Sequence, residues 1–179
     1  GTPVCYPAFG DWIGSEWRAV SPAFAHHRLM IGVEGQQNLR ADQAADDLVV
    51  PANNFRIPNS NYRVGIYVQD EWQLTATLAA TLGLRVDHDS RSDTSPSPRA
   101  ALIWQPLVDT TFKLLAGRAH RAPNAYERDY ADPASQLPNP NLQDERIDTL
   151  EIVVDQRLRK DLSLRASLYQ WLMYDIISL

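Results

Sequence analysis

Two arginines and two tyrosines occur in one polar segment of the chain, and their chemistry suits ligand binding. Arg121, Tyr126, Arg128 and Tyr130 all fall between residues 121 and 143. Guanidinium groups form charge-assisted hydrogen bonds with anions, and they also stack on aromatic rings. If the segment is a loop on a rigid scaffold, we expect these side chains to contact an anionic or aromatic ligand. The same side chains could instead anchor the loop among lipid headgroups.

Histidines and acidic residues form short clusters, but their spacing does not assemble a metal centre. His26 and His27 are adjacent, so an extended chain directs them to opposite faces, whereas a zinc site needs further ligands on one face. Five acids in two long segments lack the spacing of an EF-hand: Asp42, Asp46, Asp47, Asp129 and Asp132. We expect solvated loops with no metal and no cofactor, and a calcium-holding loop is the alternative.

A third cluster contains the residue types of a hydrolase triad. His88, Asp89 and Ser90 are consecutive, so in an extended chain they point apart and do not form the geometry that activates a serine. The sequence also has no G-x-S-x-G motif. We therefore expect no enzyme, and an outer-membrane hydrolase that uses Ser90 is the alternative.

Composition limits the fold that could position these residues. The chain has 179 residues, one cysteine and a formal net charge of −5. This length suits one domain, one cysteine cannot form an internal disulfide, and the acidic balance argues against a nucleic-acid partner. No run reaches the roughly 18 apolar residues of a helical membrane span. A soluble domain and a membrane β-barrel, whose apolar residues alternate with polar ones, both fit these limits.

Alternation of apolar and polar residues is the main structural signal. One parity in the segment 78–87 is apolar throughout: Leu78, Ala80, Leu82, Leu84 and Val86. Successive side chains of a β-strand point to opposite faces, so this pattern predicts a strand with one apolar face. The same period recurs from His27, Asp148 and Leu162. We expect no amphipathic helix.

Eight strands are predicted, joined by connections that alternate between short and long. Their ranges are Trp12–Ser21, His27–Leu39, Tyr62–Gln73, Leu78–Asp89, Arg99–Gln105, Thr111–Ala119, Ile147–Leu158 and Leu162–Tyr174. This rhythm indicates an all-β fold, an antiparallel up-and-down transmembrane β-barrel with brief turns at one end and long loops at the other. Trp72 and Trp104 each precede a short turn, so both would lie at one membrane boundary.

An apolar surface facing lipid leaves the charged side chains on the opposite face of the strands. That set comprises Arg28, Glu34, Arg63, Glu71, Arg85, Lys113, Glu151, Asp155 and Arg165. Buried charges need partners, so we expect this set to face a lumen filled by water or by a plug. Asp70 is the exception, because it shares the parity of Val64, Ile66 and Val68. We expect it near the membrane interface, or a bulge that changes the register.

Five motifs follow one another in the order typical of a single protein family. They are GIYVQDEW from Gly65, LGLRVD from Leu82, SPRAAL from Ser97, GRAHRAPN from Gly117, and NPNL shortly before Glu145. Over residues 62–175 the chain resembles the barrel of TonB-dependent outer-membrane receptors, with His120 where an aromatic residue is usual.

The resemblance implies a barrel of about 22 strands that is closed by an N-terminal plug domain, in the bacterial outer membrane. Such receptors import scarce ligands, such as ferric siderophores or cobalamin, with energy supplied through TonB. The expected partners are therefore outer-membrane lipid, the receptor's own plug domain, TonB and the ligand. Because only about eight strands are predicted, residues 1–179 would be a partial barrel without its plug.

Two alternatives to this interpretation stay open. A complete eight-stranded barrel in the outer membrane, with a structural or adhesion role, would fill its narrow interior with side chains. A soluble β-sandwich that binds a ligand would bury the apolar parity between two sheets.

Overall fold

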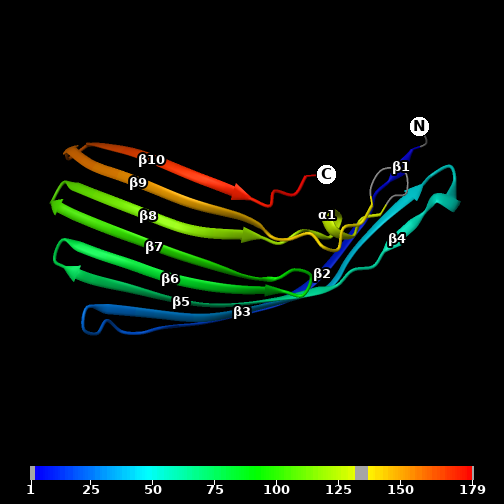
Figure 1. Ribbon diagram of the computed structural model, residues 1–179, viewed down its shortest axis with the longest axis horizontal. Helices are drawn as coiled ribbons and strands as arrows, with labels where there is room; N and C mark the ends of the chain where they lie inside the picture. Colours follow the sequence, from blue (N-terminus) through cyan, green and yellow to red (C-terminus); the bar gives the residue numbers. More distant parts are fainter. Residues whose placement is uncertain (1–2, 132–136, 179) are drawn as a thin grey trace.

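The predicted strands form one antiparallel sheet (Figure 1). The computed structural model describes residues 3–131 and 137–178, and all eight long strands are present in it. They are β2 (Ala8–Val20), β3 (His27–Asp47), β5 (Asn61–Thr75), β6 (Leu78–Asp89), β7 (Thr94–Leu107), β8 (Thr110–Arg121), β9 (Glu145–Arg159) and β10 (Leu162–Tyr174). Two short strands, β1 (Val4–Cys5) and β4 (Phe55–Ile57), pair with the far end of β3.

The long strands are ordered as a meander. Their order across the sheet is β2-β3-β5-β6-β7-β8-β9-β10, and every neighbouring pair is antiparallel. The connections after β2, β5, β7 and β9 gather at one end of the sheet, and those after β3, β6 and β8, of which the first and last are long, gather at the other, as Figure 1 shows. We call these the short-turn end and the long-loop end. The up-and-down layout predicted from connection lengths is confirmed.

Three details differ from the sequence-based expectation. β3 continues to Asp47 rather than Leu39, because β1, β2 and β4 all supply backbone partners to its polar second half. β7 begins at Thr94 rather than Arg99. The helix α1 (Ala125–Asp129) is not predicted by the sequence pattern; it is a single turn without an apolar face, held by a capping box between Asn124 and Glu127. A 3₁₀ turn, Pro51–Asn53, follows β3.

The sheet has no conventional core. Apart from Pro123, only four apolar side chains in the described residues are buried, and Ala44, Ala45 and Tyr130 among them lie at the long-loop end. Val68 and Leu84 on the apolar parity are 48% and 44% exposed. No second layer of β-structure covers the sheet in the part of the chain that is described, so the soluble β-sandwich is wrong. An apolar face of this kind is stable where the surrounding medium is itself apolar.

The opposite face of the sheet pairs its charges across strands. Arg28 lies 3.7 Å from Glu71, and Lys113 lies 2.8 Å from Asp155. Arg165 pairs with the same Asp155 from the other side. Neighbouring strands place opposite charges side by side, which lowers the cost of keeping them away from bulk water.

Asp70 lies on the apolar face with a partner of its own. It faces Leu29 in the pairing of β3 and β5, and its Oδ2 lies 2.7 Å from Nδ1 of His27. The His27 ring stacks on Trp72 with the centroids 5.0 Å apart. The bulge in this hairpin falls later, between Gln73 and Thr75, so it does not move Asp70 off this face. Asp70 therefore belongs to a polar and aromatic group at the short-turn end, on the face that we expect to meet lipid.

Strand β7 contains two prolines in the stretch that pairs with β6 but not with β8. β7 pairs with β6 from His88 and Thr94 onward, through both Pro96 and Pro98. Its pairing with β8, by contrast, starts only at Arg99 and Gly117. A proline has no amide N–H to donate, so the missing donors are tolerated on the side where β8 does not pair. β7 and β8 therefore part at the long-loop end.

The alternation predicts that a lysine destabilises the protein much more on the apolar face of β6 than on the charged face. Leu84→Lys places a charge on the apolar face and should lower the free energy of unfolding in lipid vesicles by about 2–4 kcal/mol. Thr81→Lys, on the charged face opposite Glu71, is the matched control and should change it by less than about 1 kcal/mol. Equal effects of the two lysines would contradict the assignment of the faces.

Candidate functional site

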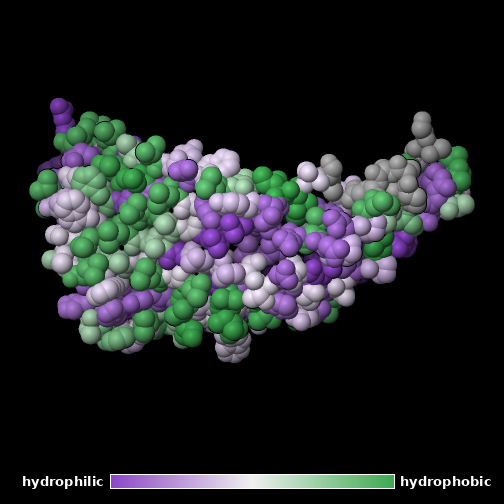
Figure 2. All heavy atoms as spheres, in the orientation of Figure 1, coloured by the Kyte–Doolittle hydropathy of each residue, from purple (hydrophilic) through white to green (hydrophobic). Residues whose placement is uncertain are grey.

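A charged depression, which we call the polar hollow, lies at the long-loop end of the sheet. It has a volume of about 590 Å³ and is lined by side chains from β3, β5, β6 and β8 together with the connections that follow them. Its defining residues are Arg63, Arg85, Asp87, Arg91, Arg121 and Asp144. Figure 2 shows hydrophilic residues gathered toward the middle of the molecule, with hydrophobic residues prominent at the short-turn end. The hollow brings side chains of both charges together from four strands and the connections that follow them.

Arg85 is fixed at the base of the polar hollow by two acids. Its Nη2 donates to Oε2 of Glu34 over 2.9 Å, and its Nε donates to Oδ2 of Asp87 over 2.7 Å. The guanidinium lies across Gly65 of β5, where any Cβ would collide with it. A side chain at position 65 would therefore have to displace the ends of Arg85 and Asp87 from this arrangement.

Arg91 keeps hydrogen-bonding capacity that the protein does not use. Its side chain is 15% exposed, and its buried Nε and Nη1 atoms have no hydrogen-bond partner among the described residues. The nearest carboxylate oxygen, of Asp89, is 3.8 Å from Nε. Asp144 is similar, because Oδ2 accepts a 2.6 Å bond from Ser95 while the buried Oδ1 has no partner. Buried groups of this kind are satisfied by a bound molecule or by water.

The connection after β8 forms one wall of the hollow. Arg121 donates from Nη1 to Glu127 over 2.8 Å and from Nε to Glu145 over 2.7 Å, so it ties α1 to the start of β9. Both acids lie outside the lipid-facing stretch of the strands. Hydrogen bonds from Arg121 lower the pKa of Glu127 and the pKa of Glu145, and those two acids in turn raise the pKa of Arg121.

The same connection reaches across three strands to β3 and β4. Asn59 donates to Asp129, and Phe55 meets the Tyr130 ring edge-on with centroids 5.6 Å apart. Tyr130 is only 6% exposed. β5, β6 and β7 lie between β3 and β8 in the sheet, so the connection spans the outer side of the hollow. We call these contacts the loop latch; α1 lies near β4 and β2 in Figure 1.

The four side chains expected to meet a ligand occupy three environments. Arg121 lines the polar hollow. The rings of Tyr126 and Tyr130 lie against each other at a tilt of 35°, with centroids 4.6 Å apart, beside Ala44 of β3. Arg128 donates from Nε to the carbonyl of Pro140 over 3.3 Å. The structure thus does not bring the four together, and ligand contact by them stays a prediction.

The six side chains expected to face a lumen share the charged face. Arg63 and Arg85 line the polar hollow, while Glu71, Lys113 and Arg165 pair with charges of neighbouring strands. Glu151 lines a depression beside Tyr169 and Trp171. Arg91, which the sequence analysis missed, sits in a four-residue turn and has no local motif that marks it.

In the clusters considered for metal binding and hydrolysis, the described side chains make their hydrogen bonds to other residues and not to one another. His88 bonds to Thr94, Asp89 accepts from Asn61, and Ser90 accepts from the Tyr62 amide. Asp47 accepts from the amides of Val49 and Val50. No group of three or more potential metal ligands is found in the described part of the chain, and Asp132 lies outside it. No helix within residues 3–131 and 137–178 is long and apolar enough to cross a membrane.

Comparison with known proteins identifies the family. The family described as "TonB dependent receptor-like, beta-barrel" matches residues 6–178. This chain belongs to that family. A curated relative, the iron-regulated outer membrane virulence protein of Vibrio cholerae serotype O1, is 30% identical over 101 residues. That alignment covers 56% of this chain and 15% of the relative, so the chain spans a small part of its relative's length.

Solved structures agree on the fold. The copper transporter OprC superposes with a TM-score of 0.78 over 97% of this chain and 32% of its own, at 16% identity. The siderophore receptor PirA from Pseudomonas aeruginosa gives a TM-score of 0.70 over 89% of this chain and 30% of its own, at 20% identity. The family is one of transport receptors rather than enzymes, and its members lie in the bacterial outer membrane.

The family and the sheet together decide between the earlier interpretations. The resemblance to TonB-dependent receptors is confirmed, as is the location in the outer membrane. Within the described residues β2 and β10 do not pair with each other. A closed eight-stranded cylinder requires that pairing, so the small complete barrel does not fit this sheet.

The Arg121 contacts should hold the loop at neutral pH and release it in acid. Because the pKa values of Glu127 and Glu145 are lowered on folding, their stabilising effect is present above the ordinary value of 4.5 and is lost as the pH falls through the lowered values. We expect amide hydrogen exchange at residues 125–129 to accelerate between pH 5 and pH 3, after correction for intrinsic exchange.

A substitution separates this effect from general acid unfolding. Arg121→Gln should speed exchange at residues 125–129 roughly threefold at pH 7, as expected for partly exposed ion pairs. It should also reduce the excess pH dependence, while the backbone amides of Asn124 and Ile177, which donate to the same two acids, should keep the remainder. Arg159→Gln, at the short-turn end, is the control and should leave both unchanged. An excess pH dependence that is undiminished in Arg121→Gln would contradict this account.

Proposed function

We propose that this chain is part of the barrel wall of an outer-membrane import receptor, and that its polar hollow contributes to ligand capture. Long loops of outer-membrane barrels face the exterior and short turns face the periplasm. With that orientation the hollow and the loop latch face the medium from which a ligand arrives. No bond is made or broken in this function, so no catalytic residue is required.

The observation that carries the proposal is the unused hydrogen-bonding capacity in the polar hollow. The Arg91 guanidinium needs an acceptor, and Oδ1 of Asp144 needs a donor. An anionic metal chelate that also carries hydroxyl or amide groups would supply both. A ferric siderophore fits that description better than cobalamin, which is the other ligand class expected. The V. cholerae relative is named for iron regulation, and a structural neighbour is named as a ferric enterobactin receptor.

The charged face would meet a plug domain in the whole receptor. Side chains such as Arg63, Glu71 and Glu151 lie on the sheet face opposite the apolar one, where a wide barrel has its lumen. On this proposal the residues described are a partial barrel, the plug closes the lumen, and TonB supplies energy through the plug. Iron is cargo in this scheme, and the chain needs no cofactor.

The test uses the whole receptor, expressed from a plasmid in cells that have no receptor of their own for the probe. The probe is radiolabelled ferric enterobactin. Arg91→Gln should weaken binding about tenfold, the effect expected when one charge-assisted hydrogen bond is lost. Arg159→Gln at the short-turn end is the matched control and should bind as the wild type does.

Energy coupling is tested separately in the same cells. Removal of TonB should leave binding of the probe intact and should stop its accumulation. Unchanged binding in Arg91→Gln would refute the role of the polar hollow. Accumulation that continues without TonB would refute the transport mechanism. Uptake of copper in place of the iron chelate would show that the ligand class is wrong while the import function is right.

A further inference from the structure

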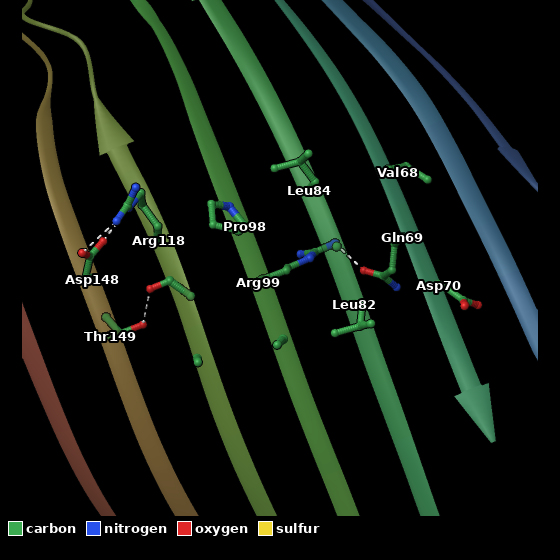
Figure 3. Close-up of a pocket in the computed structure, with 14 residues that line it drawn as sticks. Val68, Gln69, Asp70, Leu82, Leu84, Pro98, Arg99, Arg118, Asp148 and Thr149 are labelled. Carbon is green, nitrogen blue, oxygen red and sulfur yellow. Dashed lines mark hydrogen bonds and ion pairs between the residues drawn. The ribbon is translucent and has the colours of Figure 1, made fainter. Parts of the chain in front are cut away.

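A second depression, which we call the outer-face groove, lies on the apolar side of the sheet. It crosses from β5 to β9 and has a volume of about 680 Å³ (Figure 3). Val68, Leu82 and Leu84 form one side, and the smaller Ala100 and Ala116 form its floor. The pairing of β5 through β8 places these side chains on the same face as Ile66 and Leu114, opposite the polar hollow. The groove is therefore on the surface that the bilayer surrounds.

The groove ends where β7 and β8 part. Pro98 is the last groove residue on β7, and β8 continues past it without a partner on that side. Small side chains over two adjacent strands, beside leucines on a third, leave a channel that no residue of the described chain fills. Apart from Asp70 at one end and Arg118 and Asp148 at the other, the outward-facing side chains that line the channel are apolar, so a hydrocarbon chain is the occupant that suits it.

A cationic cluster stands at the long-loop end of the groove. Arg118 donates to Asp148 from Nε over 2.7 Å and from Nη2 over 3.1 Å, as Figure 3 shows. Arg146 approaches the same carboxylate at 3.7 Å and lies 4.1 Å over the Tyr174 ring. Two guanidinium groups share one carboxylate, so the cluster has a net positive charge. The buried Nε of Arg146 also has no hydrogen-bond partner among the described residues.

We propose that the outer-face groove binds lipid A, with one acyl chain in the groove and a phosphate on Arg118 and Arg146. Guanidinium groups recognise phosphate through paired hydrogen bonds, and a net positive cluster complements an anionic headgroup. The cluster is at the long-loop end, which in outer-membrane barrels faces the exterior. The phosphorylated, multiply acylated lipid of that leaflet is lipid A. This inference rests on the family's membrane location and not on ligand import.

The whole receptor, purified in mild detergent, is titrated with lipid A and observed by native mass spectrometry. Wild-type receptor should retain lipid A at this site. Ala116→Leu fills the floor of the groove and should remove the bound lipid. Ala166→Leu makes the same change on the apolar face of β10, outside the groove, and should retain it. Thermal unfolding of the two variants shows whether both are folded.

The charge contribution is tested with Arg146→Gln, which leaves the Arg118–Asp148 pair intact. It should weaken lipid A binding about fivefold, the effect of one cation near a lipid surface. Phosphatidylglycerol is titrated in parallel and should bind less tightly than lipid A. Equal retention in Ala116→Leu and Ala166→Leu, unchanged binding in Arg146→Gln, or equal binding of phosphatidylglycerol would each overturn the proposal. Ferric enterobactin binding should be unaffected by Ala116→Leu, so failure here is distinguishable from failure of the import function.

Discussion

One constraint governs this structure: each backbone amide inside a bilayer must be bonded to a neighbouring strand, while each strand shows opposite faces to lipid and to water. The sheet meets it with antiparallel pairs that run almost the whole length of β5, β6 and β9. Val68 and Leu84 are left about half exposed because lipid rather than a second protein layer covers them. The near absence of a core is a consequence of the same constraint.

The charged face of the sheet carries many ionised side chains close together, and each of them needs a partner of opposite charge. Arg85 reaches past β5 to Glu34, and Asp155 takes a cation from the strand on each side. Gly65 and Gly83 provide room for Arg85 and Arg99 to lie along the wall rather than project from it. Charged side chains that lie along the sheet and pair with opposite charges do not project into the lumen, and each charge keeps a partner. Arg91 departs from this arrangement, because its buried Nε and Nη1 atoms have no hydrogen-bond partner among the described residues.

Local sequence was enough for the strands and insufficient for the site. Alternation in Leu78–Asp89 predicts both the strand and its lipid face, because period two acts residue by residue. The extension of β3 to Asp47 depends on three partner strands, and no local pattern reports that. Tyr130 was expected to face a ligand, yet it packs on Phe55, which lies 75 residues earlier in the chain. The Asn124–Glu127 capping box was readable in the sequence, but a single helical turn produces no apolar periodicity.

The parting of β7 and β8 connects the two faces of the wall. Pro96 and Pro98 remove two donors on one side of β7, so β8 separates there, and Ser97 and His120 meet across the gap through a 2.9 Å side-chain hydrogen bond. Arg118 follows Gly117, the last residue of β8 that pairs with β7. It lines both the polar hollow and the outer-face groove. A continuous ladder would have fixed this part of β8 between two neighbours. From Arg118 to Arg121, β8 is held by β9 alone, so its side toward β7 is an open strand edge within the wall.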